Sequence, residues 1–186
     1  HLRGPLPAFG TKERAESDWQ VGDLDILREF LSYEPGTGLL RWKANRSYVK
    51  AGAVAGTKCP KRGYITVVFA GRRRYAHRLA WLLTHGSLEA GLDIDHINGD
   101  RSDNRFCNLR LATRSQNLCN SKGHAKTSRF KGVASHACRK KWRAFLGRKH
   151  LGSFESEVEA ARAADCAAKE AYGDFARLNF PEGIEA

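Results

Sequence analysis

The chain carries the sequence LDIDHINGDRSDNRFCNLRLATRSQNLCN at residues 92–120. The elements expected there are a strand at Leu92–Ile97, a polar loop at Asn98–Asn108, a strand at Leu109–Ala112 and a helix that begins after Thr113. A capping box marks the start of the helix, because the hydroxyl of Thr113 can cap it while the side chain of Gln116 reaches back. The order predicts a compact unit of two strands and one helix.

The pair Asp95-His96 closes the first of these strands. A carboxylate can bind a hard divalent cation through oxygen, and an imidazole beside it can take a proton from water. Adjacent strand residues point to opposite faces, so both serve one site only where the strand distorts or ends. The pair alone is equally consistent with a structural histidine. A calcium loop starting at Asp93 is excluded, because Asn98 and Asn104 stand where that loop needs glycine and glutamate.

Further elements are expected on the N-terminal side of this unit. They are a flexible arm at 1–22, a short helix at Asp25–Ser32, a strand at Leu39–Trp42, strands at Tyr64–Phe69 and Arg72–Tyr75, and a helix at Ala76–Thr84. Ala70-Gly71 between the last two strands is typical of a tight hairpin, and Gly86 is a typical helix stop.

The C-terminal third predicts a second module. After a linker at 121–128, the expected elements are strands at Phe130–Ser135, Lys141–Leu146 and His150–Phe154 and a helix from Ser156 to Tyr172. The middle strand alternates, with Trp142 and Ala144 on one face and Arg143 and Phe145 on the other. The pattern predicts a three-stranded antiparallel sheet packed on one alanine-rich helix.

The charge is strongly basic and unevenly placed. Lys and Arg number 32 against 20 Asp and Glu, a formal net charge of +12. Residues 35–88 contain eleven basic residues and no acid, and residues 126–149 contain nine and no acid. Residues 151–186 carry three basic and eight acidic residues, a net charge of −5. Two uncompensated basic stretches indicate contact with a polyanion, most simply nucleic acid, against the alternative of a solvated surface.

The composition excludes several classes of protein. With 41% hydrophobic and 28% charged residues, the chain is typical of a globular protein and not of a disordered one. No apolar run reaches the roughly 18 residues of a membrane span, and the first twenty residues lack the apolar core of a signal peptide. The five cysteines include no Cys-x-x-Cys pair, which argues against a structural zinc site and favours reduced thiols in the cytoplasm.

Several motifs follow one another between residues 77 and 117. They are His77-Arg78-Leu79, Asp-His-Ile-Asn-Gly-Asp at 95–100, Asn104-Arg105, Asn108-Leu109-Arg110 and Ser115-Gln116-Asn117. In combination they resemble the HNH nuclease family, in particular its phage and intron-encoded endonucleases, over about Tyr33 to Cys119. Asn117 replaces the last histidine of the family, which makes this a His-Asn-Asn variant. The resemblance implies a ββα-metal nuclease core within a domain at 23–120.

The resemblance also implies roles for individual residues. His96 corresponds to the general base and Asn108 to the residue that fixes its imidazole. Asp95 and Asn117 correspond to the ligands of one divalent metal ion, and the neutral amide of Asn117 favours Mg²⁺ or Mn²⁺ over zinc. Three arginines are candidate phosphate contacts, equally consistent with surface or fold-supporting roles: Arg78, Arg105 and Arg110.

A second resemblance covers residues 130–181. Its motifs are Phe130-Lys-Gly-Val133, Trp142-Arg-Ala144, His150-Leu-Gly-Ser-Phe154, Ala160-Ala-Arg-Ala-Ala-Asp165 and Leu178-Asn-Phe-Pro181. They resemble the apetala-two/ethylene-response-factor DNA-binding domain, which lays a three-stranded sheet in the major groove with its helix packed behind. The resemblance implies a DNA-binding domain at 129–186. Its candidate DNA contacts are Lys131, His136, Arg143, Arg148 and His150.

The sequence therefore predicts an α+β protein of two modules, a homing-type, metal-dependent endonuclease that cleaves double-stranded DNA. Its expected location is the cytoplasm of a bacterial or phage-infected cell, with no membrane and no obligate protein partner. The main alternative is a DNA-binding regulator with an inert nuclease core, which would bind DNA without cleaving it. A third interpretation is an RNA-binding or RNA-cleaving protein, against which the lack of ring-stacking RNA motifs counts.

Overall fold

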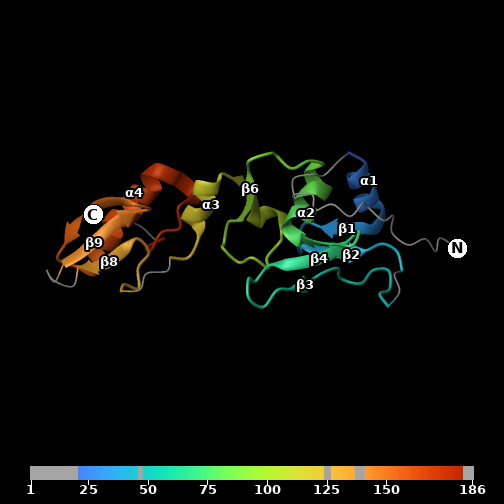
Figure 1. Cartoon of the computed structure of the whole chain (residues 1–186), viewed down its shortest axis with the longest axis horizontal. Coiled ribbons are helices and arrows are strands. Elements are labelled where there is room, and N and C mark those ends of the chain that lie inside the picture. The colour runs from blue at the N-terminus through green and yellow to red at the C-terminus, as the bar shows by residue number, and fades with distance from the viewer. Residues whose placement is uncertain (1–20, 46–47, 124–126, 137–140, 182–186) are drawn as a thin grey trace. The chain divides into compact units, whose positions relative to one another are not determined.

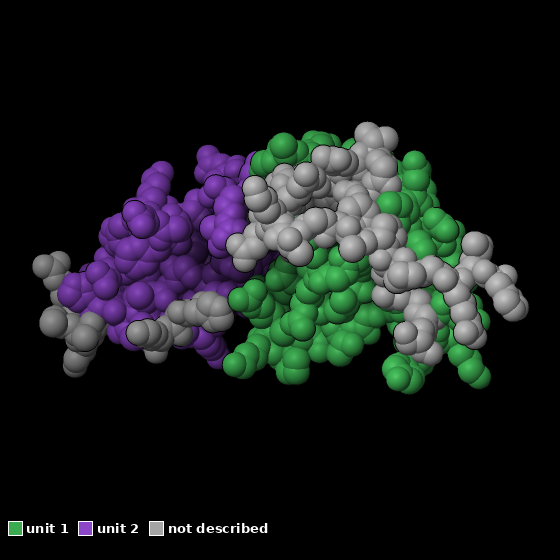
Figure 2. Space-filling view, turned by 45° about the vertical axis from the view of Figure 1, so that its right-hand side comes forward, with its two compact units in different colours: residues 1–111 green, residues 112–186 purple. Residues whose placement is uncertain are grey.

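The computed structural model describes residues 21–45, 48–123, 127–136 and 141–181. The chain divides into two compact units, residues 1–111 and 112–186, which are coloured separately in Figure 2. The predicted arm at 1–22 lies outside the described residues except for its last two, where the first helix begins.

The first unit combines two long helices with three small sheets. Its elements are α1 (Val21–Phe30), β1 (Leu31–Glu34), β2 (Leu39–Trp42), β3 (Thr57–Lys58), β4 (Ile65–Phe69), β5 (Arg72–Tyr75), α2 (Ala76–His85), β6 (Asp93–His96), the 3₁₀ turn η1 (Phe106–Asn108) and β7 (Leu109–Ala112) (Figure 1). Strands β1 and β2 pair, β4 lies between β3 and β5, and β6 pairs with β7. The last residue of β7 begins the second unit.

The core of the first unit follows from strand alternation. Val67 and Phe69 of β4 are buried while Val68 between them is exposed, so one face of this sheet packs inward and the other faces solvent. The inward face joins Leu27, Leu79 and other apolar residues of the helices in one cluster. The β6–β7 pair adds a smaller cluster that includes Trp81 of α2.

Two turns have the chemistry that the sequence predicts. Ala70 and Gly71 have φ values of 50° and 74°, so both central residues of the β4–β5 hairpin are left-handed, which matches the twist of the strands. Helix α2 ends at Gly86, whose φ is 80° and whose N–H donates to the carbonyl of Leu82.

The second unit is a three-stranded antiparallel sheet packed on one long helix. Its elements are α3 (Arg114–Asn120), β8 (Val133–His136), β9 (Lys141–Leu146), β10 (Lys149–Phe154), α4 (Glu157–Tyr172) and the 3₁₀ turn η2 (Gly173–Phe175), with β9 central in the sheet. Both predicted capping boxes form, at Thr113 for α3 and at Ser156 for α4. Ala160, Ala161 and Ala164 let α4 lie close on the sheet, where they are buried with Val133 and Ala144.

A carboxylate on α4 fixes the end of the described chain. Asp165 is 2% exposed and accepts hydrogen bonds from the backbone N–H of Asn179 and Phe180 and from the Asn179 side-chain amide, at 2.8–2.9 Å. The Asn179 side chain in turn accepts from the N–H of Lys131 and donates to its carbonyl. Asp165 therefore joins the last segment to the residues that lead into β8.

The predicted α+β class is confirmed, since the chain combines helices with small antiparallel sheets. Several elements differ from expectation, and the two-residue strand β3 is one that the sequence does not predict. The helix predicted at Asp25–Ser32 runs from Val21 to Phe30, because Leu31 and Ser32 turn into β1, a strand that the sequence analysis missed. The strand predicted at Phe130–Ser135 starts only at Val133, because Gly132 has a φ of 75° that no strand accommodates.

The first compact unit ends at residue 111 and so leaves α3 in the second unit, whereas the predicted nuclease domain runs to residue 120. The predicted domain limits stay a prediction, since they mark a family resemblance and not a packing unit. Within the described ranges, no helix is both long and apolar enough to cross a membrane.

Candidate active site

Asp95 and His96 are both buried at the end of β6, with 5% and 4% of their surface exposed. Their side chains have different partners. The Asp95 carboxylate accepts two hydrogen bonds from the guanidinium of Arg110 on β7, at 2.9 and 3.0 Å. Buried carboxylates and imidazoles are costly unless they are paired, and Arg110 supplies the pairing for Asp95.

The ring of His96 is held by an asparagine from the following loop. His96 Nε2 lies 3.0 Å from Oδ1 of Asn104, which is itself 2% exposed. When that oxygen accepts the Nε2 proton, the lone pair of the neutral ring lies on Nδ1. Burial lowers the pKa of His96 below 6.5, against the opposing effect of the Asn104 bond. His96 is therefore a neutral imidazole, able to take up a proton, at neutral pH.

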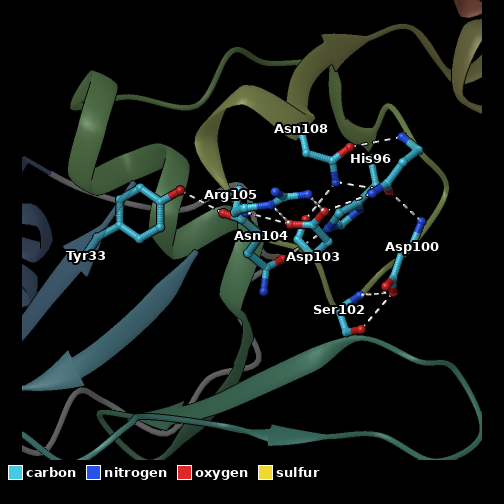
Figure 3. Close-up of polar contacts among 9 residues, drawn as sticks. Tyr33, His96, Asp100, Ser102, Asp103, Asn104, Arg105 and Asn108 are labelled. Atoms are coloured by element: carbon cyan, nitrogen blue, oxygen red, sulfur yellow. Dashed lines mark hydrogen bonds and ion pairs between the residues drawn. The ribbon is translucent and has the colours of Figure 1, made fainter. Parts of the chain in front are cut away.

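The loop between β6 and β7 is fixed by its own polar side chains (Figure 3). Asn108 Nδ2 donates to the carbonyl of Asp103 at 2.8 Å, and its Oδ1 accepts from the N–H of Asn98 at 3.0 Å. The carboxylate of Asp103 accepts two charged hydrogen bonds from Arg105, which lower the pKa of Asp103 to about 2. Asn108 thus closes the loop that carries Asn104.

The β1–β2 hairpin holds the same loop from the other side. The hydroxyl of Tyr33 donates to the carbonyl of Asn104 at 2.7 Å, and burial raises the pKa of Tyr33 to about 12. The turn of the hairpin comes so close that a Cβ at Gly38 would meet the Arg105 nitrogen at 2.5 Å, and Gly38 also has a φ of 75°. Only glycine fits there without displacing the loop.

Two aromatic rings, those of His77 and Tyr64, contact the imidazole of His96, and Tyr75 packs behind His77. His77, from the first turn of α2, meets His96 edge-on with ring centroids 5.1 Å apart. Tyr75 stacks on His77 at 5.4 Å, and Tyr64 lies within 6.0 Å of both histidine rings. His77 Nδ1 is buried and has no hydrogen-bond partner among the residues that the structure describes. The rings limit the positions that His96 can take.

We expect acidification to destabilise the first unit, because burial holds the pKa of His77 well below 6.5. His96 and Arg78 lower the pKa of His77 further, and the rings of Tyr64, Tyr75 and His96 contact it. At His77 the folded state binds fewer protons than the unfolded chain. The contribution of the neutral ring to the free energy of unfolding is therefore complete above pH 6.5 and is lost as the pH falls. Denaturant unfolding at pH 7 and pH 5 measures the loss.

The variant His77→Phe keeps a ring in the cluster and should flatten this pH dependence. A free energy of unfolding that stays constant from pH 7 to pH 5 in the unchanged protein would contradict the assignment of His77 as a buried neutral ring.

The structure gives the remaining predicted nuclease residues varied surroundings. Asn117 is half-buried on α3, in the second unit, and its N–H donates to the carbonyl of Thr113. Arg78 is half-buried on α2, while Arg105 and Arg110 pair with Asp103 and Asp95. No cluster of three or more His, Cys, Asp or Glu suited to a metal ion occurs in the described part of the chain. The predicted roles of these residues stay predictions.

The predicted DNA contacts of the second unit divide into two groups. Arg143, Arg148 and His150 lie on the sheet or its β9–β10 turn, and His136 ends β8. Lys131 differs, since its ammonium donates to the carbonyl of Cys119 and burial lowers its pKa.

Sequence reasoning missed two residues of this site. The sequence assigns no role to Asn104, yet its side chain contacts His96, and only its place in the motif Asn104-Arg105 points to more than a loop residue. His77 was quoted within a motif without a role, and the structure places its ring against His96. Both contacts depend on segments that return from elsewhere in the chain.

Comparison with known proteins gives three matches. The model of an HNH endonuclease family matches residues 74–119, the segment from β5 to α3. Protein 3.8 of Escherichia phage T7 is 30% identical over 106 residues, which cover 55% of this chain and 88% of that protein. A solved structure titled "DNA binding and cleavage by the HNH homing endonuclease I-HmuI" aligns at 26% identity and a TM-score of 0.37. That alignment covers 48% of this chain and 49% of the other, so the chain spans about half its length.

Proposed function

We propose that this chain, whose residues 74–119 match an HNH endonuclease family, is a metal-dependent endonuclease that hydrolyses phosphodiester bonds in double-stranded DNA. The observation that carries the proposal is the buried pair at the end of β6, with Asp95 bound to Arg110 and His96 held neutral by burial. A neutral imidazole can act as a general base toward water, and a buried carboxylate beside it can hold a hard cation.

In the proposed mechanism, His96 is the general base. Asn104 and the ring of His77 fix the imidazole so that it takes a proton from the attacking water without rotating away. Such a base contributes about 10²–10⁴-fold to the rate. Asn108 supports the arrangement by closing the loop, because its amide binds the carbonyl of Asp103, directly before Asn104.

The residues fit one hard divalent metal ion, Mg²⁺ or Mn²⁺, because the predicted ligands offer oxygen only. Asp95 supplies a buried carboxylate, and the resemblance adds the amide oxygen of Asn117. When bound, such an ion stabilises negative charge on the phosphate and on the departing oxygen. The two hydrogen bonds from Arg110 hold the Asp95 carboxylate in position.

Incubation of supercoiled plasmid DNA with Mg²⁺, with Mn²⁺ or with EDTA tests the proposed function. We expect nicked or linear products with either metal and none with EDTA. DNA binding without cleavage under every metal condition would favour the regulator with an inert nuclease core. If the same incubation with RNA gives cleavage and plasmid DNA stays intact, the result would favour an RNA-cleaving protein.

We further propose that the sheet of the second unit is the DNA-binding module of a homing-type enzyme. Ala144 and Trp142 of β9 pack against α4, so Arg143 and Phe145 lie on the opposite face, with the Arg143 guanidinium 5.5 Å from the Phe145 ring. Arg143 Nε is buried and has no hydrogen-bond partner within the described ranges. An arginine on the sheet face opposite α4 supports the apetala-two-like interpretation, because that family uses this face to contact DNA.

Replacing Arg143 by alanine should reduce sequence preference. A guanidinium bound to a base edge contributes about 1–3 kcal/mol of discrimination, whereas a phosphate contact weakens binding on all sequences equally. Competition binding of cognate and scrambled duplexes measures the difference. The matched control is Arg162→Ala on the exposed side of α4, the helix behind the sheet. Equal effects of the two substitutions would contradict base recognition by Arg143.

The relative from a phage supports the cytoplasm of a phage-infected bacterium as the proposed place of action. The proposed partner there is double-stranded DNA, which the two acid-free basic stretches of the chain favour.

A further inference from the structure

The outer face of the sheet β3–β4–β5 carries an arginine that the nuclease site does not use. Thr66 of β4 pairs with Thr57 on one side and Tyr75 on the other, and Val68 pairs with Arg73. Since Val67 and Phe69 point into the core, Thr66, Val68, Arg73 and Tyr75 share the solvent face.

Thr66, Arg73 and Tyr75 of this face line a hollow of about 200 Å³ that is rich in cationic side chains and also reaches Arg74, the partner of Val67. Its lining is Cys59, Arg62, Thr66, Arg73, Arg74 and Tyr75. Arg62 is held there by a hydrogen bond from its guanidinium to the Tyr75 hydroxyl, at 3.4 Å. One water occupies about 30 Å³ of liquid, so the hollow has room for a phosphodiester group.

None of the residues that line the hollow is acidic. The sequence from Pro35 to Leu88 contains no aspartate or glutamate, and it supplies every residue that lines the hollow. Guanidinium groups bind phosphate oxygens through paired, charge-assisted hydrogen bonds, and the hydroxyls of Thr66 and Tyr75 add further polar groups.

The hollow is close to the candidate active site within the same unit. Tyr75 lines the hollow and also stacks on His77, whose ring meets His96. The rings of Tyr75 and His77 therefore connect the hollow to the imidazole of the proposed general base.

A second hollow of about 420 Å³ adjoins the first, because Thr66 and Arg73 line both. It adds the exposed apolar side chains of Tyr48, Val49 and Val68. Sugars and base edges present apolar surface beside each phosphate, so this composition suits a DNA strand better than a free anion.

We propose that the hollow between Arg62 and Arg73 binds one backbone phosphate of the DNA substrate close to the bond that is cut. This inference rests on the proposed function and adds a contact surface, in the first unit, to the sheet of the second unit. The site positions the duplex on the nuclease unit and contributes affinity without sequence preference.

The test is DNA binding by the full chain in EDTA, measured over a series of salt concentrations so that cleavage plays no part. Arg73→Gln should weaken binding about tenfold at low salt on every sequence and lower the salt slope by about 0.9, the value for one phosphate. The control is Arg72→Gln, which removes the same charge from the opposite face, where Arg72 pairs with Phe69. The control should leave the slope unchanged.

A second arm locates the phosphate. On a duplex cut by the wild type, single uncharged methylphosphonates near the cut should weaken binding of the wild type at one position and not weaken Arg73→Gln further there. Two results would overturn the site alone: equal salt slopes for Arg73→Gln and the wild type, or an equal loss of DNA affinity in Arg73→Gln and Arg72→Gln. Failure of the wild type to bind any DNA would overturn the proposed function and the site together.

Discussion

Replacing His96 by alanine is expected to slow DNA cleavage by about 10²–10⁴-fold and to leave DNA affinity close to that of the wild type. The reason is that the imidazole acts on water and is 4% exposed, so it offers little surface to the duplex. Single-turnover cleavage with saturating protein measures the chemical step, and a binding titration in EDTA measures affinity.

His85→Ala is the matched control, since His85 lies exposed on α2. Its ring stacks on Trp81 and lies near Phe106, and no ring contact with His96 is present among the described residues. Asn104→Ala should fall between the two, because it frees the His96 ring without removing it. A His96→Ala variant that cleaves at the wild-type rate would show that another group takes the proton.

Replacing Asp165 by alanine is expected to destabilise the second unit by about 3 kcal/mol or more, because each hydrogen bond to a charged group contributes about 1.5–3 kcal/mol. The substitution leaves the N–H groups of Asn179 and Phe180 without their acceptor in a half-buried position. It also releases the Asn179 side chain that holds Lys131.

Amide hydrogen exchange in the intact chain reports on each unit separately. Exchange in β8, β9 and β10 should become about a hundredfold faster in Asp165→Ala, while β4 and β5 keep their wild-type rates. The control is Asp174→Ala, whose carboxylate is 92% exposed in its pair with Lys169 and should matter little. Unchanged exchange in the three strands would mean that the apolar contacts of α4 suffice without this carboxylate.

The elements that the sequence predicts correctly are those with local signals. The limits of β2, β7 and β9 match the prediction, because alternation and flanking turns define short strands without reference to the rest of the chain. Helices α3 and α4 begin where their capping boxes predict. Strand β1 escaped prediction because it follows α1 without any turn residue, and only its pairing with β2 makes it a strand.

The candidate site divides in the same way. Asp95 and His96 are recognisable because they occur within spaced motifs, and both are buried at the end of β6. The contact of Asn104 with His96 needs the loop to fold back, and the bond from Tyr33 to Asn104 joins residues 71 positions apart. No local pattern encodes such a distance, so sequence spacing could not assign Asn104.

The close approach of Gly38 to the loop limits how far the segment that matches the HNH family can be moved between proteins. The segment that matches the family, 74–119, includes Asn104 but not the β1–β2 hairpin against which its loop rests. A graft that began at residue 74 would lose the Tyr33 hydroxyl and the backbone bond between Phe106 and Pro35. Recombination that transfers this segment to another protein must therefore carry residues 31–42 along with it, or supply an equivalent support.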